Sequence, residues 1–217
     1  MTFEQQIRWV YKPILFVACL LPLAHVLAGV FGVGGVSLGA NPIDKIQDTL
    51  GKWGLNFLLI TLCVTPLRQL TELNALVRLR RMLGLFAFTY VTLHFANWLI
   101  LDQTLDLSAI VEDIGKRPYI TIGFVGFLML IPLAVTSTNR MMRKLGRRWQ
   151  KLHRLVYVVA ILGIWHFYWQ VKKDIREPLI YAGVLTLLLG FRLWRHWRRQ
   201  SVAPRVAPVQ PTQSLPG

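Results

Sequence analysis

The sequence LHRLVYVVAILGIWHFYWQV, residues 152–171, is the stretch on which the interpretation of the fold depends. It is 20 residues long and mostly apolar, which is what an α-helix needs to cross the hydrocarbon core of a bilayer. Two histidines, His153 and His166, nevertheless lie within it. Ionisable side chains are costly inside a membrane and usually serve a function there. This stretch therefore predicts a membrane span and also indicates where chemistry is to be sought.

Five other segments of the chain approach this length and have the same apolar character. Together the six segments predict an all-α fold, a bundle of six transmembrane helices. The predicted spans are Ile14–Val33, Trp53–Leu67, Met82–Leu101, Tyr119–Val135, Leu152–Val171 and Leu179–Leu193. The second and sixth are short, so we expect tilted helices or interfacial ends there. The first has no small-residue cleavage site after a short apolar core, and we treat it as a retained span rather than a signal peptide.

The charge of the chain is unusual for its composition. Of the 217 residues, 54% are hydrophobic and 16% are charged, yet the net charge is +15. When the loops are assigned alternately to two sides, the set that includes the N-terminus carries +16 and the other set −1. Lys and Arg in short loops mark the cytoplasmic side, so both termini are predicted to be cytoplasmic. Nucleic-acid binding is the weaker explanation, because no soluble module with interleaved aromatic residues accompanies the charge.

The chain is predicted to form one membrane domain followed by a tail. Residues 1–199 contain the six spans, and residues 200–217 are rich in Pro, Gln and Ser, which predicts a disordered cytoplasmic tail. No internal repeat is apparent. Cys19 and Cys63 fall inside apolar segments, where they act as small hydrophobic residues and imply no disulfide framework. The loops are too short for a flavin or nicotinamide domain, so an electron donor and acceptor would have to be separate molecules.

His94 and His166 are predicted to lie at equal depth in the membrane. His94 is about 20 Å along its helix from Arg81, and His166 is about 21 Å from Leu152. Both helices run in the same direction, so the two imidazoles can face each other across a flat ligand. This arrangement suits haem, whose iron takes one axial imidazole from each side, and two axial ligands favour electron transfer over oxygen chemistry. The alternative is that each histidine hydrogen-bonds a carbonyl or hydroxyl group on a neighbouring helix.

His153 precedes His166 by 13 residues, a rise of about 20 Å that would place two haems toward opposite faces of the bilayer. On an ideal helix, however, the two side chains point about 140° apart. Either the helix is bent or wound differently near Gly163, or the two histidines serve different sites. The third span has Arg80 and Arg81 at the level of His153 and no histidine there, so an interfacial histidine without a haem is an open alternative.

The remaining histidines and the charged loops are weaker candidates. His25 could lie near a cofactor edge, although a hydrogen-bonded interior histidine is the favoured interpretation, and His196 lies in a basic run that predicts a solvated or headgroup-facing side chain. The basic loop Arg140–Lys151 could bind an anionic partner, although an orientation signal explains it better. The acidic outer loop Asp102–Asp113 is either the docking place of a partner or an ordinary solvated loop.

Over residues 39–171 the sequence resembles the haem-binding membrane subunits of protein-methionine-sulfoxide reductase systems, the MsrQ or YedZ family of the ferric-reductase-like transmembrane superfamily. The stretches that carry the resemblance are GANPIDKIQDTLGKWGLNFLLITLCVTPLRQL (39–70), LRRMLGLFAFTYVTLHF (79–95), IGKRPYITIGFVG (114–126), PLAVTS (132–137) and LGRRWQKLHRLVYVVAILGIWHFYW (145–169). Any one histidine would be unspecific, whereas the stretches taken together are specific.

The resemblance implies a multi-pass protein of the bacterial inner membrane that binds one or two b-type haems, with His94, His153 and His166 as axial ligands of the iron. It also implies FMN as a cofactor, without indicating residues for it. Electrons would pass from a quinol or a cytosolic flavin reductase to a separate periplasmic molybdopterin subunit, which reduces methionine sulfoxide in oxidised envelope proteins. The chain would then be an electron-transfer subunit and not itself the enzyme.

In the wider superfamily two pairs of histidines hold two stacked haems, whereas the third span here offers only His94. We therefore expect His94 and His166 to ligate one haem, and His153 to ligate a second haem or to tune the first. Two alternatives remain: a stand-alone transmembrane ferric or quinone reductase, and a haem-free transporter or assembly scaffold in which the histidines are internal hydrogen-bonding groups.

Overall fold

The computed structural model describes residues 3–171 and 174–202, and within these ranges all regular elements are helices. Six helical stretches are long and apolar enough to cross a membrane, which confirms the predicted all-α fold and the number of spans. The six stretches are Glu4–Phe31, Pro42–Thr71, Asn74–Asp102, Pro118–Val135, Arg147–Gln170 and Arg176–Arg198.

These stretches are made of long helices, short helical turns and helical connections. In chain order the elements are α1 (Phe3–Gln6), η1 (Ile7–Tyr11), α2 (Lys12–Phe31), η2 (Val33–Gly35), α3 (Pro42–Thr71), η3 (Asn74–Leu76), α4 (Val77–Asn97), η4 (Trp98–Asp102), α5 (Leu107–Lys116), α6 (Pro118–Val135), α7 (Asn139–Leu145), α8 (Arg147–His153), α9 (Leu155–Gln170) and α10 (Arg176–Val202). The loop predicted at Asp102–Asp113 thus contains most of the helix α5, and the basic loop at Arg140–Lys151 contains most of α7 and of α8.

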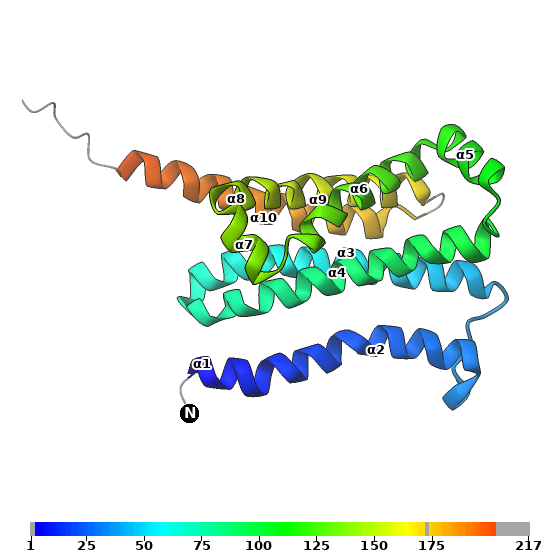
Figure 1. Cartoon of the computed structure of the whole chain (residues 1–217), viewed down its shortest axis with the longest axis horizontal. Helices are drawn as coiled ribbons and strands as arrows, with labels where there is room; N and C mark the ends of the chain where they lie inside the picture. Colours follow the sequence, from blue (N-terminus) through cyan, green and yellow to red (C-terminus); the bar gives the residue numbers. More distant parts are fainter. Residues whose placement is uncertain (1–2, 172–173, 203–217) are drawn as a thin grey trace, which may run out of the picture.

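Helices α3 and α4 form an antiparallel pair in the middle of the molecule, with α6, α9 and α10 on one side and α2 on the other (Figure 1). The most extensive packing is between α3 and α4 and between α6 and α9. The beginning of α1 and the end of α10 lie at the same end of the bundle, and α5 lies at the opposite end (Figure 1). An even number of crossings produces this arrangement. That the shared end is cytoplasmic remains a prediction from the charges.

Two helices are longer than the apolar segments from which they were predicted. The second span was expected at Trp53–Leu67, but α3 covers Pro42–Thr71; the sixth, expected at Leu179–Leu193, lies within α10. The side chain of Asn41 caps α3 by accepting a hydrogen bond from the backbone N–H of Asp44 at 3.5 Å, and Pro42 fits the first turn because its φ is already helical. The polar residues before Trp53 are therefore part of α3 and not of a loop.

A proline inside α3 explains how α10 is attached. Pro66 has no N–H and cannot donate to the carbonyl of Leu62 one turn earlier. The guanidinium of Arg192 in α10 donates to that carbonyl and also donates to the hydroxyl of Tyr157 in α9 at 2.6 Å. Backbone groups without a partner are costly in a membrane, so this one side chain satisfies α3 and joins three helices.

The first span is attached to α4 by a buried tyrosine. The hydroxyl of Tyr90 donates to the carbonyl of Cys19 at 2.8 Å and accepts from the N–H of Leu23 at 3.0 Å. It therefore stands between two groups of α2 that would otherwise bond to each other, next to Pro22. Tyr90 is completely buried, and this contact is the main polar link between α2 and the rest of the bundle.

The remaining predictions on the chain's organisation have mixed outcomes. The tail was predicted to begin at residue 200, but α10 continues to Val202. Residues 203–217, where most of the predicted disordered tail falls, lie outside the described residues. Cys19 and Cys63 are both free, the first buried and the second exposed, in agreement with the prediction that they form no disulfide.

Candidate functional site

A cavity of about 350 Å³ lies inside the bundle between α3, α4, α6 and α9. Most of its wall is apolar. The lining residues that are exposed lie at one end of these helices; they are Asp44, Asp102, Arg117 and Gln170. The cavity therefore opens at the end of the bundle where α5 lies (Figure 1).

His94 and His166 both line this cavity, His94 from α4 and His166 from α9. Their ring centroids are 6.1 Å apart, and the ring planes are nearly perpendicular, at 83°. The two imidazoles thus lie side by side at one level of the bundle, as their equal depth along parallel helices predicted. Both rings line the same cavity, so they can bind the same group.

The two histidines have the same kind of partner at Nδ1. Nδ1 of His94 is 2.9 Å from the backbone carbonyl of Gln47, and Nδ1 of His166 is 2.7 Å from that of Tyr119. A carbonyl oxygen only accepts hydrogen bonds, so Nδ1 carries the proton in both rings. In the neutral imidazole Nε2 then has a free lone pair, which is the tautomer that binds a metal through Nε2.

A glycine lies against each imidazole. A Cβ on Gly51 would be 2.9 Å from the ring of His94, and a Cβ on Gly123 would be 2.8 Å from Nδ1 of His166. Any larger residue at these positions would displace the rings. Three residues further on, Gly54 and Gly126 also line the cavity. The absence of side chains at these positions lets a flat group approach the helix backbone closely.

These contacts reveal a structural repeat, which corrects the sequence analysis. The pair α3–α4 and the pair α6–α9 each combine a Gly-x-x-Gly motif with a histidine 43 residues after its first glycine. The motifs are Gly51–Gly54 with His94 and Gly123–Gly126 with His166. The repeated motif is present in the sequence, but it consists of only three residues in each half, and the residues around them are not the same in the two halves. Only the equivalent contacts in the structure make the two halves recognisable.

The sequence analysis also missed Gln47 and Asn97. Nε2 of the Gln47 side chain is 3.3 Å from Nε2 of His94, and Asn97 donates from Nδ2 to Oε1 of Gln47 at 2.7 Å. Nδ2 of Asn97 is also 3.4 Å from the carbonyl of Ile43. Oδ1 of Asn97 is buried and has no hydrogen-bond partner in the part of the chain that the structure describes. No motif predicted these two amides, because their role depends on which way α3 and α4 face.

His153 lies apart from this cavity. Its Nε2 is 3.0 Å from the hydroxyl of Thr136, and its ring stacks on Trp149 with the centroids 3.9 Å apart. The helix is interrupted at Arg154, where hydrogen bonds between residues three apart replace the α-helical ones. The predicted change of winding therefore occurs at Arg154 and not near Gly163, and His153 and His166 do face different surroundings.

The other two histidines lie on the surface. His25 is exposed on α2, so the interior position that the sequence favoured is wrong, and it does not line the cavity described above. His196 is exposed on α10, with Nε2 3.0 Å from the amide nitrogen of Gln200. The prediction of a solvated or headgroup-facing His196 agrees with this exposure.

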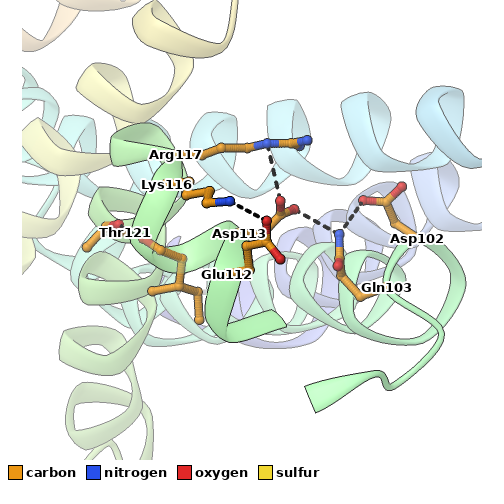
Figure 2. A network of polar contacts seen from close by, with 8 residues as sticks. Asp102, Gln103, Glu112, Asp113, Lys116, Arg117 and Thr121 are labelled. Carbon is orange, nitrogen blue, oxygen red and sulfur yellow. Dashed lines mark hydrogen bonds and ion pairs between the residues drawn. The ribbon is translucent and has the colours of Figure 1, made fainter. Parts of the chain in front are cut away.

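A network of polar contacts joins α5 to the residues around it, two of which, Asp102 and Arg117, line the cavity (Figure 2). The carboxylate of Asp113 accepts from the amide of Gln103 at 2.9 Å and pairs with Arg117 at 3.2 Å. Gln103 also contacts Asp102, which lines the opening together with Arg117. The pKa of Arg117 is raised by the neighbouring Tyr119 side chain and then by Asp113, so the guanidinium remains charged. Arg117 is therefore a permanent cation in a network that also contains the carboxylates of Asp102 and Asp113.

A second cation lies at the same opening. Lys52 of α3 pairs with Asp48 at 3.1 Å and with Glu177 at the start of α10 at 2.6 Å. Lys52 and Arg117 are the cations among the described residues that line the cavity. Both are paired with carboxylates, and Asp44, Asp48 and Asp102 line the same cavity, so charges of both signs lie at this end.

Six spans around a cavity with facing imidazoles define a class, the helical membrane proteins that hold paired histidines inside the bundle. Comparison with known proteins narrows the class. The model of the family described as ferric reductase like transmembrane component matches residues 50–164. A protein of Xanthomonas oryzae pv. oryzae (strain MAFF 311018), "Protein-methionine-sulfoxide reductase heme-binding subunit MsrQ", is 49% identical over 209 residues, 94% of this chain and 95% of the relative.

Two further relatives carry the same name. One, from Bordetella pertussis, is 50% identical over 195 residues, 88% of this chain and 93% of the relative. The other, from Ralstonia nicotianae, is 55% identical over 163 residues, 74% of this chain and 75% of the relative. The chain therefore belongs to the MsrQ family, the protein-methionine-sulfoxide reductase heme-binding subunits, within the ferric-reductase-like transmembrane proteins.

Proposed function

We propose that the chain is a haem b-binding electron-transfer subunit of the bacterial inner membrane, and that His94 and His166 are the axial ligands of one haem. The observation that carries this proposal is the pair of imidazoles inside a mostly apolar cavity. Their ring centroids are 6.1 Å apart, and Nδ1 of each ring donates a hydrogen bond to a backbone carbonyl. The relatives' printed name, a heme-binding subunit, supports the same assignment.

The donor set of the cavity fits haem better than a free metal ion. Within residues 3–171 and 174–202 no group of three or more His, Cys, Asp or Glu side chains could hold a metal ion. A metal bound here by two imidazoles must bring its other ligands, as the iron of haem does with the porphyrin nitrogens. The glycines beside both rings leave space for such a flat group, and the wall of the cavity is mostly apolar, as the porphyrin faces require.

The polar residues of the cavity discussed above then have defined roles. His94 and His166 would bind the iron, and the carbonyls of Gln47 and Tyr119 keep both rings in the binding tautomer. Lys52 and Arg117 are the cations of the cavity lining that could pair with the haem carboxylates, in competition with the carboxylates they already contact. When bound, the haem supplies reversible one-electron transfer. The helices around it exclude water, and the two fixed imidazoles limit the reorganisation that accompanies a change of charge.

The chain passes electrons across the membrane and is not itself the catalytic subunit. The donor is a quinol or a cytosolic flavin reductase, and the acceptor is a periplasmic molybdopterin subunit that reduces methionine sulfoxide in oxidised envelope proteins. The relatives' name, which assigns them to a methionine-sulfoxide reductase, and the charge asymmetry, which favours cytoplasmic termini, support this direction. FMN is a further proposed cofactor, without assigned residues.

His153 is a candidate ligand for a second haem or a residue that tunes the first. It faces Thr136 and Trp149 outside the cavity, so the first of these roles requires a second site near the start of α9. Arg80 of α4 is close enough to interact electrostatically with His153. A second haem held by two histidines would need a histidine on α4 at this level.

The proposal is tested by the visible spectrum of the purified full-length protein, expressed with haem supplied. We expect a Soret band and a reduced b-type α band, with a haem-to-protein ratio of one or two. A colourless protein that is folded by circular dichroism would contradict the proposal and favour a haem-free transporter or scaffold. Sustained ferric or quinone reductase activity without a periplasmic partner would favour a stand-alone reductase.

A further inference from the structure

The two cavity histidines are alike at Nδ1 but differ at Nε2. Nε2 of His94 is 3.3 Å from the side-chain nitrogen of Gln47. Nε2 of His166 has no hydrogen-bond partner among residues 3–171 and 174–202, although its Nδ1 contact matches that of His94. The two halves of the structural repeat therefore differ at Nε2, the atom of each ring that would bind iron.

The direction of the hydrogen bond between Gln47 and His94 follows from the surrounding groups. The proton of His94 is on Nδ1, so Nε2 can only accept, and the Gln47 amide nitrogen donates to it. The opposite end of that amide, Oε1, accepts from Nδ2 of Asn97, and Asn97 is itself oriented by the carbonyl of Ile43. Reversing the Gln47 amide would place two NH₂ groups against each other, so the donor is held toward His94.

We propose that Gln47 competes with the haem iron for the lone pair of His94 Nε2, which makes the His94 side the exchangeable axial position. A small neutral ligand such as carbon monoxide binds there in the reduced protein, while His166 stays attached. This inference rests on the proposed haem site. It goes beyond that site because two permanent axial ligands would leave no position for an added ligand.

The exchange is balanced in atoms and charge. The bond between iron and His94 Nε2 breaks, a bond between iron and the carbon of carbon monoxide forms, and the N–H of Gln47 donates to the freed Nε2. No proton or electron is transferred. The wall of the whole cavity is mainly apolar, with Leu55, Val91 and Phe95 among its residues, and this favours a neutral ligand over an anion.

The Gln47 hydrogen bond sets the size of the effect. A hydrogen bond of this kind contributes enough net free energy to change an equilibrium about fivefold. Replacing Gln47 by Met keeps an unbranched side chain of similar length but removes the donor. We therefore expect Gln47→Met to bind carbon monoxide about fivefold more weakly than the unchanged protein, and to lose haem more slowly to a haem acceptor such as apomyoglobin.

The experiment is a carbon monoxide titration of the reduced, purified full-length protein, followed by the difference spectrum in the Soret region. Gln170→Met is the matched control, because Gln170 lines the same cavity from α9 and its side chain makes no hydrogen bond among the described residues. We expect it to behave as the unchanged protein. A second variant, Gln47→Glu, retains the length but places an acceptor opposite Nε2, and should weaken carbon monoxide binding at least as much as Gln47→Met.

The outcomes separate this inference from the proposed function. A Soret band together with equal carbon monoxide affinity in the unchanged protein and both Gln47 variants overturns the inference and leaves the haem assignment intact. If the unchanged protein has a Soret band but binds no carbon monoxide at a saturating concentration, the inference is likewise overturned and the haem assignment stays intact. A protein without a Soret band overturns both. Weaker binding confined to the Gln47 variants supports the exchangeable position.

Discussion

At the scale of single residues, the candidate site consists of groups that fix two imidazoles. Each ring has a backbone carbonyl at Nδ1 and a glycine at its edge. Histidines elsewhere in the described chain lack this combination; His153, for example, has a hydroxyl and an indole as neighbours. Position in an apolar helix thus indicated which histidines to consider, and their contacts show which two share a cavity.

Replacing either cavity histidine should change the haem spectrum. We expect His166→Ala to lose most of its haem, and His94→Ala to lose the spectrum typical of two axial imidazoles, because only one imidazole then remains for the iron. The measurements are the haem-to-protein ratio and the Soret and α bands of the purified variants. His196→Ala is the control, since His196 is exposed on α10 and should leave both unchanged. An unchanged spectrum in either cavity variant would contradict the assignment.

A methyl group at Gly123 should disturb the site without harming the helix. In Gly123→Ala the new Cβ would lie 2.8 Å from Nδ1 of His166, so the ring must move away from its carbonyl partner. In a helix interior Ala is otherwise favoured over Gly by about 1 kcal/mol. We expect reduced haem content with unchanged helical circular dichroism. Gly183→Ala, in open space on α10, serves as control and should bind haem normally.

At the scale of secondary-structure elements, the helices are joined by side chains that compensate for prolines. Arg192 donates to the Leu62 carbonyl that Pro66 leaves free, and Tyr90 stands between two backbone groups of α2 beside Pro22. These contacts position α10 and α2 against the central pair. They explain how helices with largely apolar, lipid-facing surfaces keep a defined place in the bundle, where apolar contact alone gives little specificity.

Removing the Arg192 guanidinium should destabilise the bundle. Arg192→Met leaves the Leu62 carbonyl and the Tyr157 hydroxyl without this donor, at a cost of about 1–3 kcal/mol for an unsatisfied buried group. We expect a lower midpoint of thermal unfolding in detergent. Arg198→Met on the same helix is the matched control, because Arg198 is exposed and should leave the midpoint unchanged. Equal midpoints for both variants would show that the contact is dispensable.

At the scale of the whole molecule, the charge asymmetry predicts which end faces the cytoplasm. The α5 end carries most of the acidic residues and the opening of the cavity, and the opposite end carries most of the Arg and Lys residues. If the basic end is cytoplasmic, the proposed haem lies toward the periplasmic surface, where the proposed acceptor subunit is found. Orientation and function are therefore linked, and they can be tested together.

The orientation predicts which added cysteines an impermeant thiol reagent can reach. In a chain carrying Cys63→Ser, we expect Val111→Cys on α5 to react in cells whose outer membrane is permeabilised, because Val111 is 71% exposed. Met142→Cys on α7 should react only after the inner membrane is opened. The reverse pattern would contradict cytoplasmic termini. Buried Cys19 provides the background signal in both variants.

The extent of prediction differs between fold and site. Apolar length and one-sided charge were sufficient for the six spans, and equal depth was sufficient to associate His94 with His166. The polar start of α3 was not foreseen, because its apolar residues are interspersed with polar ones. The Asn41 cap and the packing of Ile46 and Leu50 hold it in the helix. His25 was misjudged because a position within an apolar helix does not say whether a side chain faces the core or the lipid.

The sequence by itself determined the membrane spans, their alternation and the depth of each histidine, because these depend on residue type and on the fixed rise of a helix. The tertiary structure decided which atoms meet. The carbonyls at Nδ1, the glycines beside the rings and the amide of Gln47 at His94 depend on how each helix is rotated and how closely it packs. Rotation and packing distance result from contacts between segments far apart in the chain, so local sequence patterns do not specify them.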